Sequence, residues 1–397
     1  MPVLSRDEYM IRYNLTEFFK LSAALNYQLS VSGDFGWNIL RIIIGDMKLS
    51  REQHNILLDA LSYLNHAYKD QHRRLGPMSV IHPLRATAIL SRTVEKADML
   101  DLLTVLLHDK HEDIQPSNYP EDKYGNNYYQ QLENEFKKFL YKNDPNDNWY
   151  LMERLDLLSR KGEESYYTYI GRLMSRAQQT PELVRVKLAD RLDNTLDLHS
   201  EFYDPIEHID FFGTLFNILY IKNYQPPEPE VQHPVRHPLY GAYRLYQLFK
   251  NAVLLSLVRQ KRSMTYDPAA QPLFEQLVRA GMEEAQRIII HIFNYHMRDV
   301  ERQRELILDT MNYCKAGGTL EVTRPGARSR LDGLFMNYFE YSNAEERKQK
   351  LDQLYKDKPL MIQAALAFVT IFKNFLIDPQ YCIEGICENG FHPRDGV

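Results

Sequence analysis

The fold of this chain is decided by residues 102–113, whose sequence is LLTVLLHDKHED. The apolar run at its start predicts a buried helix, which ends in an imidazole beside a carboxylate, His108 and Asp109. Both groups offer a lone pair to a divalent cation, so they are candidate metal ligands. On a continuous helix residue i+4 lies above residue i, which places Glu112 over His108 and Asp113 over Asp109. The stretch therefore predicts four candidate ligands or acid–base groups on one face.

Helical patterns continue on both sides of this stretch. Ser50-x-x-Gln53 predicts a capping box at the start of a helix, and Pro83 suits the first position of the next helix. Thr180, followed by a proline and a glutamate, is typical of a further helix start. Segments with helical spacing continue over residues 183–196, 243–260, 273–295, 344–355 and 360–376. Because no segment of any length alternates as a strand does, we expect an all-α fold.

Breaks in the helical pattern divide the chain into three expected parts. Residues 1–49 are interpreted as an N-terminal helical extension, and residues 50–205 as the domain that carries the chemistry. That domain contains a polar, tyrosine-rich insert or lid at about residues 116–161. A proline-rich break at residues 225–230 is the expected linker within a helical C-terminal region, residues 206–397, whose role the sequence leaves open.

Composition narrows the classes of partner. The 397 residues hold 48 basic and 53 acidic side chains, so the net charge of −5 gives no reason to expect a nucleic-acid or membrane partner. Three cysteines are too few for a disulfide framework and favour a reducing compartment, with the cytoplasm as the expected location. The longest apolar stretch, around residues 364–372, is shorter than a membrane span. The sequence does not determine the oligomeric state, and a homo-oligomer is one alternative.

A second polar face lies on the helix that contains residues 186–194. Its Lys187, Asp190 and Asn194 share one side of the helix by their spacing. The set His82, His108, Asp109 and Asp190 offers two nitrogens and two carboxylates. A mixed set of this kind suits a six-coordinate ion such as Mn²⁺ better than a closed structural zinc site.

Four motifs resemble the hydrolase domain of RelA/SpoT-type alarmone enzymes, a branch of the HD phosphohydrolase superfamily. In chain order they are AYKDQHRR at 67–74, IHP at 81–83, HDKHED at 108–113 and KLADRLDN at 187–194. The resemblance covers roughly residues 50–200 and implies an HD-domain helical bundle. The synthetase domain of the bifunctional enzymes is not recognisable, so we expect a stand-alone hydrolase with additional helices.

The resemblance also implies a function and a role for each matching residue. The family removes the 3′-pyrophosphate of guanosine tetra- and pentaphosphate, the alarmones (p)ppGpp of the stringent response, with manganese as cofactor. The matching metal ligands are His82, His108, Asp109 and Asp190. The acidic pair that positions and activates water matches Glu112 and Asp113, and the nucleotide-binding positions match Arg73, Arg74 and Asn194. This chemistry is consistent with what a metal ion and a nearby carboxylate do.

Two departures from the family pattern bear on specificity. Residues 77–81 have the sequence PMSVI, where the family often has an acidic residue, a proline and a tyrosine, which leaves guanine and adenine alarmones as alternatives. Lys110 and His111 stand where small apolar residues are common, and we expect His111 to face solvent.

Each candidate also has a plainer interpretation. His82 could cap a helix, and Glu112 and Asp113 could be solvated surface acids. Arg73 and Arg74 could lie at the end of a helix, where the helix dipole favours positive charge. His291 and His296 are interpreted as core histidines of an apolar helix face. For the whole protein the alternatives are an HD phosphohydrolase of another nucleotide and a nucleotide-sensing regulatory protein.

Overall fold

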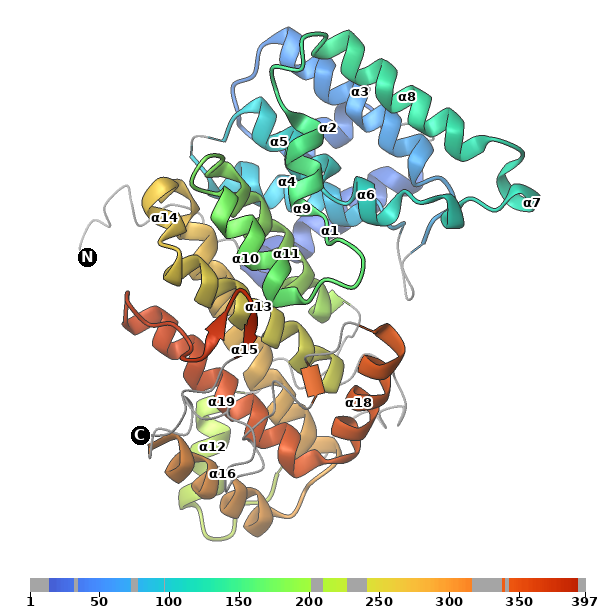
Figure 1. Cartoon of the computed structure of the whole chain (residues 1–397). Coiled ribbons are helices and arrows are strands. Elements are labelled where there is room, and N and C mark those ends of the chain that lie inside the picture. The colour runs from blue at the N-terminus through green and yellow to red at the C-terminus, as the bar shows by residue number, and fades with distance from the viewer. Residues whose placement is uncertain are drawn as a thin grey trace, which may run out of the picture. The chain divides into compact units, whose positions relative to one another are not determined.

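The computed structural model describes residues 14–31, 35–72, 78–95, 97–200, 210–226, 241–315, 338–339 and 343–391. The regular elements in these residues are helices, apart from one short hairpin. Its two strands, β1 (Ile386–Cys387) and β2 (Gly390–Phe391), have two residues each. The all-α prediction is therefore confirmed. The chain forms two compact units (Figure 1).

The first unit comprises the described residues up to Arg160, together with residues 176–201 and 263–276. Its helices are α1 (Leu15–Val31), α2 (Trp37–Ile44), α3 (Arg51–Ala67), α4 (Ile81–Thr93), α5 (Met99–Leu107), α6 (Lys110–Asp113), η2 (Pro116–Asn118), α7 (Glu121–Tyr124), α8 (Tyr128–Asn143), α9 (Leu151–Leu158), α11 (Glu182–Ser200), α14 (Ser263–Tyr266) and η4 (Pro268–Ala270). The first six residues of α15 (Gln271–Tyr295) also belong to it.

Helix α4 forms the centre of the first unit. It packs against α1, α2, α5 and α11, and residues 81–90 are all buried. Because α1 and α2 pack on α4, they are part of this unit's core, whereas the sequence suggested a separate extension. Helix α4 begins at Ile81, so Pro83 lies within its first turn and not at its first position. A proline is tolerated there because the first N–H groups of a helix have no partner within it.

Local caps start the helices on either side of α4. Ser50 forms the expected capping box of α3, in which Gln53 N donates to Ser50 Oγ at 3.1 Å and Ser50 N donates to Gln53 Oε1 at 2.8 Å. Asp98 and Asp101 form an equivalent box at the start of α5. In the region expected as an insert, α8 lies alongside α3 (Figure 1).

Asp101 makes the stability of the first unit dependent on pH. Burial raises its pKa to about 6, against the opposing effect of the positive charge of Arg185, which binds Asp101 and also binds Asp267 with two hydrogen bonds of 2.8 Å. The raised pKa means that the folded state favours protonated, neutral Asp101. Protonation of Asp101 therefore stabilises the fold below about pH 4, and this stabilisation is lost as the pH rises through about 6. We expect the stability of wild type relative to Asp101→Asn to fall by about 2 kcal/mol over that range. Urea unfolding of both proteins at a series of pH values measures this difference, and parallel pH profiles would contradict it.

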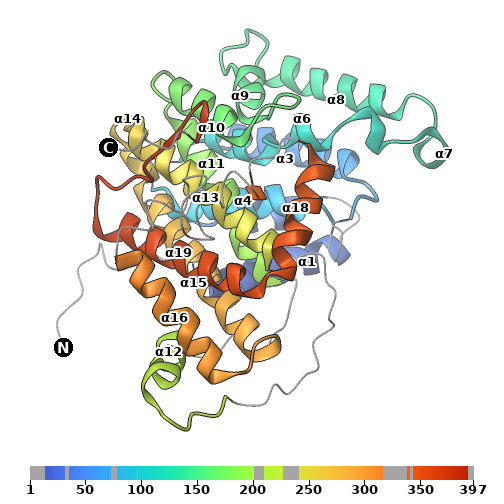
Figure 2. The same ribbon diagram turned by 60° about the horizontal axis from the view of Figure 1, so that its bottom comes forward.

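The second unit comprises residues 161–175, the described part of 202–262, and the described residues from Leu277 onward. It contains most of α10 (Tyr166–Arg176), then α12 (Phe211–Tyr220), α13 (Ala242–Gln260), the rest of α15, α16 (Val300–Lys315), α18 (Ala344–Lys356), α19 (Lys358–Ile377) and the hairpin. Helix α19 packs against α13, α16 and α18, as both views show (Figures 1 and 2).

Helix α19 is longer than the apolar stretch that is visible in the sequence. Its 20 residues are long and apolar enough to cross a membrane, whereas the apolar stretch at residues 364–372 alone is shorter than a membrane span. Within its most apolar window 61% is buried inside the protein, as is usual for the core helix of a globular unit. The cytoplasmic location therefore stays a prediction.

Two segments cross the division expected from the sequence at residues 205 and 206. Most of α10 belongs to the second unit, and α14 with η4 belongs to the first. Most of the expected proline-rich linker, from residue 227 onward, lies outside the described residues.

Candidate metal centre

The four predicted metal ligands lie together in the first unit. His82 comes from α4, Asp190 from α11, and His108 and Asp109 form the turn after α5. His82 Nε2 lies 3.3 Å from Asp109 Oδ2 and 3.3 Å from Asp190 Oδ1. His108 Nε2 lies 3.1 Å from Asp109 Oδ1 and 3.6 Å from Asp190 Oδ1. Among the described residues, the ligand atoms of His82, His108 and Asp109 lie within 4.8 Å of one another.

The hydrogen bonds of the two histidines determine which ring nitrogen faces this cluster. His108 Nδ1 lies 2.7 Å from the carbonyl oxygen of Val105, and His82 Nδ1 lies 2.6 Å from Asp193 Oδ2. Because both partners can only accept, each Nδ1 carries the proton. Each Nε2 then points a lone pair at carboxylate oxygens, and His108 Nε2 is buried without a hydrogen bond. Four electron-pair donors converge on one point, an arrangement that a cation satisfies.

The carboxylates of this cluster also shift the pKa values of the two histidines. Burial lowers the pKa of His82, but its contacts with Asp109, Asp190 and Asp193 outweigh burial and raise it well above its usual value. The pKa of His108 is raised in the same way by Asp109 and Asp190, against the effect of burial. In the absence of a metal ion, protons on the imidazoles would supply the positive charge that the carboxylates require.

A buried network supports His82 from the side opposite the ligands. Asp193 is fully buried and accepts hydrogen bonds from Arg85 Nε at 2.8 Å and Nη2 at 3.1 Å, in addition to its contact with His82. Arg85 also pairs with Asp197 at 2.6 Å and stacks over the Phe18 ring at 4.7 Å. A ligating histidine commonly donates its second N–H to a carboxylate, which fixes the orientation of its ring. Neither Asp193 nor Arg85 is distinguished as a supporting residue by the sequence pattern alone.

Asp193→Asn is expected to weaken both the fold and the metal centre. The substitution keeps the shape of the side chain but removes the charge opposite the buried Arg85 guanidinium, which costs about 3 kcal/mol of unfolding free energy. It also loosens His82, so Mn²⁺ affinity should fall by about 10- to 100-fold. Urea unfolding and calorimetric titration with Mn²⁺ measure the two effects. Asp122→Asn on the exposed start of α7 is the control, and equal behaviour of the two variants would contradict the role of Asp193.

Asp190 is held by two neighbours on its own helix. Lys187 Nζ lies 2.6 Å from Asp190 Oδ2, and Asn194 Nδ2 donates to Asp190 Oδ1 at 2.6 Å. Although burial raises the pKa of Asp190, Lys187 and the two histidines hold it well below its usual value. The structure thus places Asn194 against a candidate ligand, and its contact with a nucleotide stays a prediction.

The helix is interrupted just before the acidic pair. Helix α5 ends at Leu107, and the amides of Glu112 and Asp113 both donate to Asp109 O, at 3.0 and 2.8 Å. Glu112 N therefore bonds the carbonyl oxygen three residues before it, which is a tighter turn than that of an α-helix. The Glu112 side chain is exposed and accepts from Arg160 N at 2.9 Å. The continuous helix on which the expected position of Glu112 over His108 depends is therefore interrupted at His108 and Asp109.

Asp113 lies closer to the cluster. It is half-buried, and Tyr68 Oη donates to its Oδ2 at 2.9 Å. Burial and the neighbouring charge of Asp109 raise its pKa to about 6. A carboxyl group with this pKa is a base at neutral pH and can accept a proton from a reacting group.

The two unusual residues of the motif have structural roles. Lys110 is buried, pairs with Glu133 at 2.9 Å and lies over the Phe136 ring at 4.6 Å, which joins the motif to α8. His111 is half-buried rather than turned to solvent, and its Nε2 lies 3.2 Å from Asp156 Oδ1.

The predicted phosphate-binding arginines, Arg73 and Arg74, lie outside the described residues. No protein-family model, curated protein or solved structure matches the chain. The resemblance to RelA/SpoT-type hydrolases therefore rests on the four sequence motifs alone.

Proposed function

We propose that this protein is a divalent-metal-dependent phosphohydrolase that removes the 3′-pyrophosphate of (p)ppGpp. The observation that carries the proposal is the convergence of His82 Nε2, His108 Nε2 and the carboxylates of Asp109 and Asp190 on one buried point. Two nitrogen and two oxygen donors suit Mn²⁺, although other divalent cations take similar sets. The alarmone as substrate is inferred from the motif resemblance, whereas the hydrolytic chemistry is inferred from the site.

Each residue of the site has a separate role in the proposed reaction. A bound divalent ion would neutralise phosphate oxygens and lower the pKa of a water molecule. Asp113, held by the Tyr68 hydroxyl, accepts the proton of the attacking water. Asp193 and Asn194 keep His82 and Asp190 in position. Arg73 and Arg74 bind the phosphates as planar donors.

The test is a hydrolysis assay on the full chain with Mn²⁺. Pyrophosphate release is measured with guanosine 3′,5′-bis-diphosphate, its adenine counterpart, and guanosine 5′-diphosphate as the substrate that lacks a 3′-diphosphate. We expect release from a 3′-diphosphate substrate and none after chelation of the metal. Activity only on nucleotides without a 3′-diphosphate would favour another HD phosphohydrolase. Tight binding of the alarmone without turnover would favour a nucleotide sensor.

A further inference from the structure

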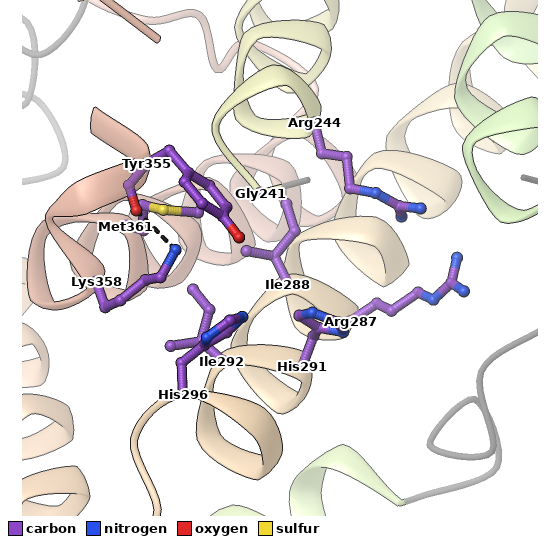
Figure 3. Close-up of a pocket in the computed structure, with 10 residues that line it drawn as sticks. All are labelled: Gly241, Arg244, Arg287, Ile288, His291, Ile292, His296, Tyr355, Lys358 and Met361. Carbon is purple, nitrogen blue, oxygen red and sulfur yellow. Dashed lines mark hydrogen bonds between the residues drawn. The ribbon is translucent and has the colours of Figure 1, made fainter. Parts of the chain in front are cut away.

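Two features of the second unit play no part in the proposed hydrolysis, a hollow and an exposed apolar face. The hollow is lined mainly by α13, α15, α18 and α19 (Figure 3). His291 and His296, which the sequence suggested were core histidines, line it instead, one half-buried and the other exposed. Its basic groups do not converge, because Arg244 and Arg287 lie at one end and Lys358 at the other (Figure 3). The hollow therefore does not define a site for one charged ligand.

The apolar face is centred on α12, which packs against α16 (Figures 1 and 2). Phe211 and Ile218 are the buried residues of α12. Phe212, Phe216 and Tyr220 follow one another at intervals of four residues, so they share a different side of the helix, and all three are exposed. The rings of Phe216 and Tyr220 lie against each other, with their centres 5.1 Å apart. A stripe of aromatic rings is therefore exposed along α12.

Helix α16 extends this apolar stripe. Arg304 donates from Nε to Ile218 O at 2.8 Å and from Nη2 to Ile221 O at 3.3 Å, which joins one side of α16 to the C-terminal end of α12. Leu308 and Met311 lie four and seven residues after Arg304, on the same side of α16, and both are exposed. We call the combined surface the α12 face, and its residues are Phe212, Phe216, Tyr220, Ile221, Leu308 and Met311.

The α12 face is large for an apolar surface in contact with water. A large apolar side chain presents about 150–250 Å² when fully exposed, and these six are 44% to 72% exposed, so the face presents on the order of 600 Å². The largest apolar patch of a typical monomer is about 300–600 Å² and is often an interaction site. Two such faces together would bury about 1,200 Å², which reaches the area of specific protein–protein interfaces.

The charges around α12 favour a second copy of the chain as the partner. The helix itself has no charged residue, whereas helices that lie on membranes usually carry lysine and arginine on their polar face. Asp210, just before α12, and Lys222, just after its end, are both exposed, and Phe216 is midway between them. When two α12 helices lie antiparallel about a two-fold axis at Phe216, Asp210 of each copy faces Lys222 of the other.

We propose that two copies of this chain associate through the α12 face, with their α12 helices antiparallel and Phe216 of each copy beside the two-fold axis. The proposal does not depend on the hydrolase chemistry, since every residue that carries it lies in the second unit.

Sedimentation velocity of the full chain over a range of concentrations, with metal chelated, tests the proposal. We expect a dimer. Tyr220→Glu places a charge inside the apolar interface and should weaken the dimer by about tenfold or more. Tyr141→Glu makes the same change at an exposed tyrosine of α8, in the first unit, and should associate as wild type. The two tyrosines are 72% and 78% exposed, so neither substitution removes a buried side chain from the fold.

The antiparallel arrangement is tested by the charges at its two ends. Lys222→Glu would set two acids opposite each other at both ends of the helix pair, so it should weaken the dimer, most strongly at low salt. Adding Asp210→Asn removes this repulsion and keeps a side chain that can cap α12, so the double variant should recover part of the loss.

Three outcomes would overturn the proposal. One is a chain that stays monomeric at about 100 µM, well above the dissociation constant of a specific dimer. Another is a Tyr220→Glu variant that associates as tightly as Tyr141→Glu. The third is a monomer that binds phosphatidylcholine vesicles and loses this binding in Tyr220→Glu, which would make the α12 face a membrane contact. An unchanged dimer in Lys222→Glu would overturn the antiparallel arrangement.

Discussion

Asp109→Asn is expected to abolish hydrolysis and to lower Mn²⁺ affinity by about 100-fold or more. Asp109 is the one carboxylate whose two oxygens approach both histidines, Oδ2 at 3.3 Å from His82 Nε2 and Oδ1 at 3.1 Å from His108 Nε2. An asparagine of the same shape removes the negative charge and replaces one acceptor with an NH₂ donor. A divalent ion would then meet one fewer anionic ligand in a buried site.

The measurements for Asp109→Asn are metal content after dialysis against Mn²⁺ and the rate of pyrophosphate release. Asp122→Asn, an exposed carboxylate change in the same unit, is the control and should behave as wild type. A variant of Asp109 that retained stoichiometric metal and full activity would remove the basis of the metal centre.

Asp113→Asn is expected to lower the hydrolysis rate by about 10² to 10⁴, while Glu112→Gln has a much smaller effect. The difference follows from their surroundings. Asp113 is half-buried, hydrogen-bonded to Tyr68, and has a pKa of about 6, whereas Glu112 is exposed and accepts from Arg160 N. The family resemblance alone treats the two acids as one pair, and the geometry separates them.

The dependence of the rate on pH provides a sharper test of Asp113. A general base with a pKa of about 6 is active when ionised, so the rate should rise as the pH increases through about 6. Tyr68→Phe removes a hydrogen bond that favours the ionised form, which should shift this rise to higher pH. Steady-state assays between about pH 5 and 8 measure both. Equal losses in Glu112→Gln and Asp113→Asn, or an unshifted profile in Tyr68→Phe, would contradict the assignment.

Residues close in sequence were the ones whose arrangement could be predicted. The capping box of Ser50 and Gln53 and the helix around Asp190 were foreseen, because their partners lie three or four residues apart. The same periodicity did not predict the interruption of the helix at His108 and Asp109. The chain leaves the α-helix at Asp109, which has φ −87° and ψ 5°.

The residues that hold the metal ligands in place could not be predicted from the spacing of residues in the sequence. His82 and Asp193 are 111 residues apart, and Asp193 lies among acidic and apolar residues that give it no distinguishing signal.

The sequence by itself determined the helical class, the helix caps and the residue types of the candidate metal ligands, because these depend on hydrogen bonds and periodicity within a few residues. Only the tertiary structure decided which carboxylate supports His82 and which acid lies beside the cluster. Those relations arise when helices distant in the chain pack together, and packing depends on the shape and burial of whole helix faces.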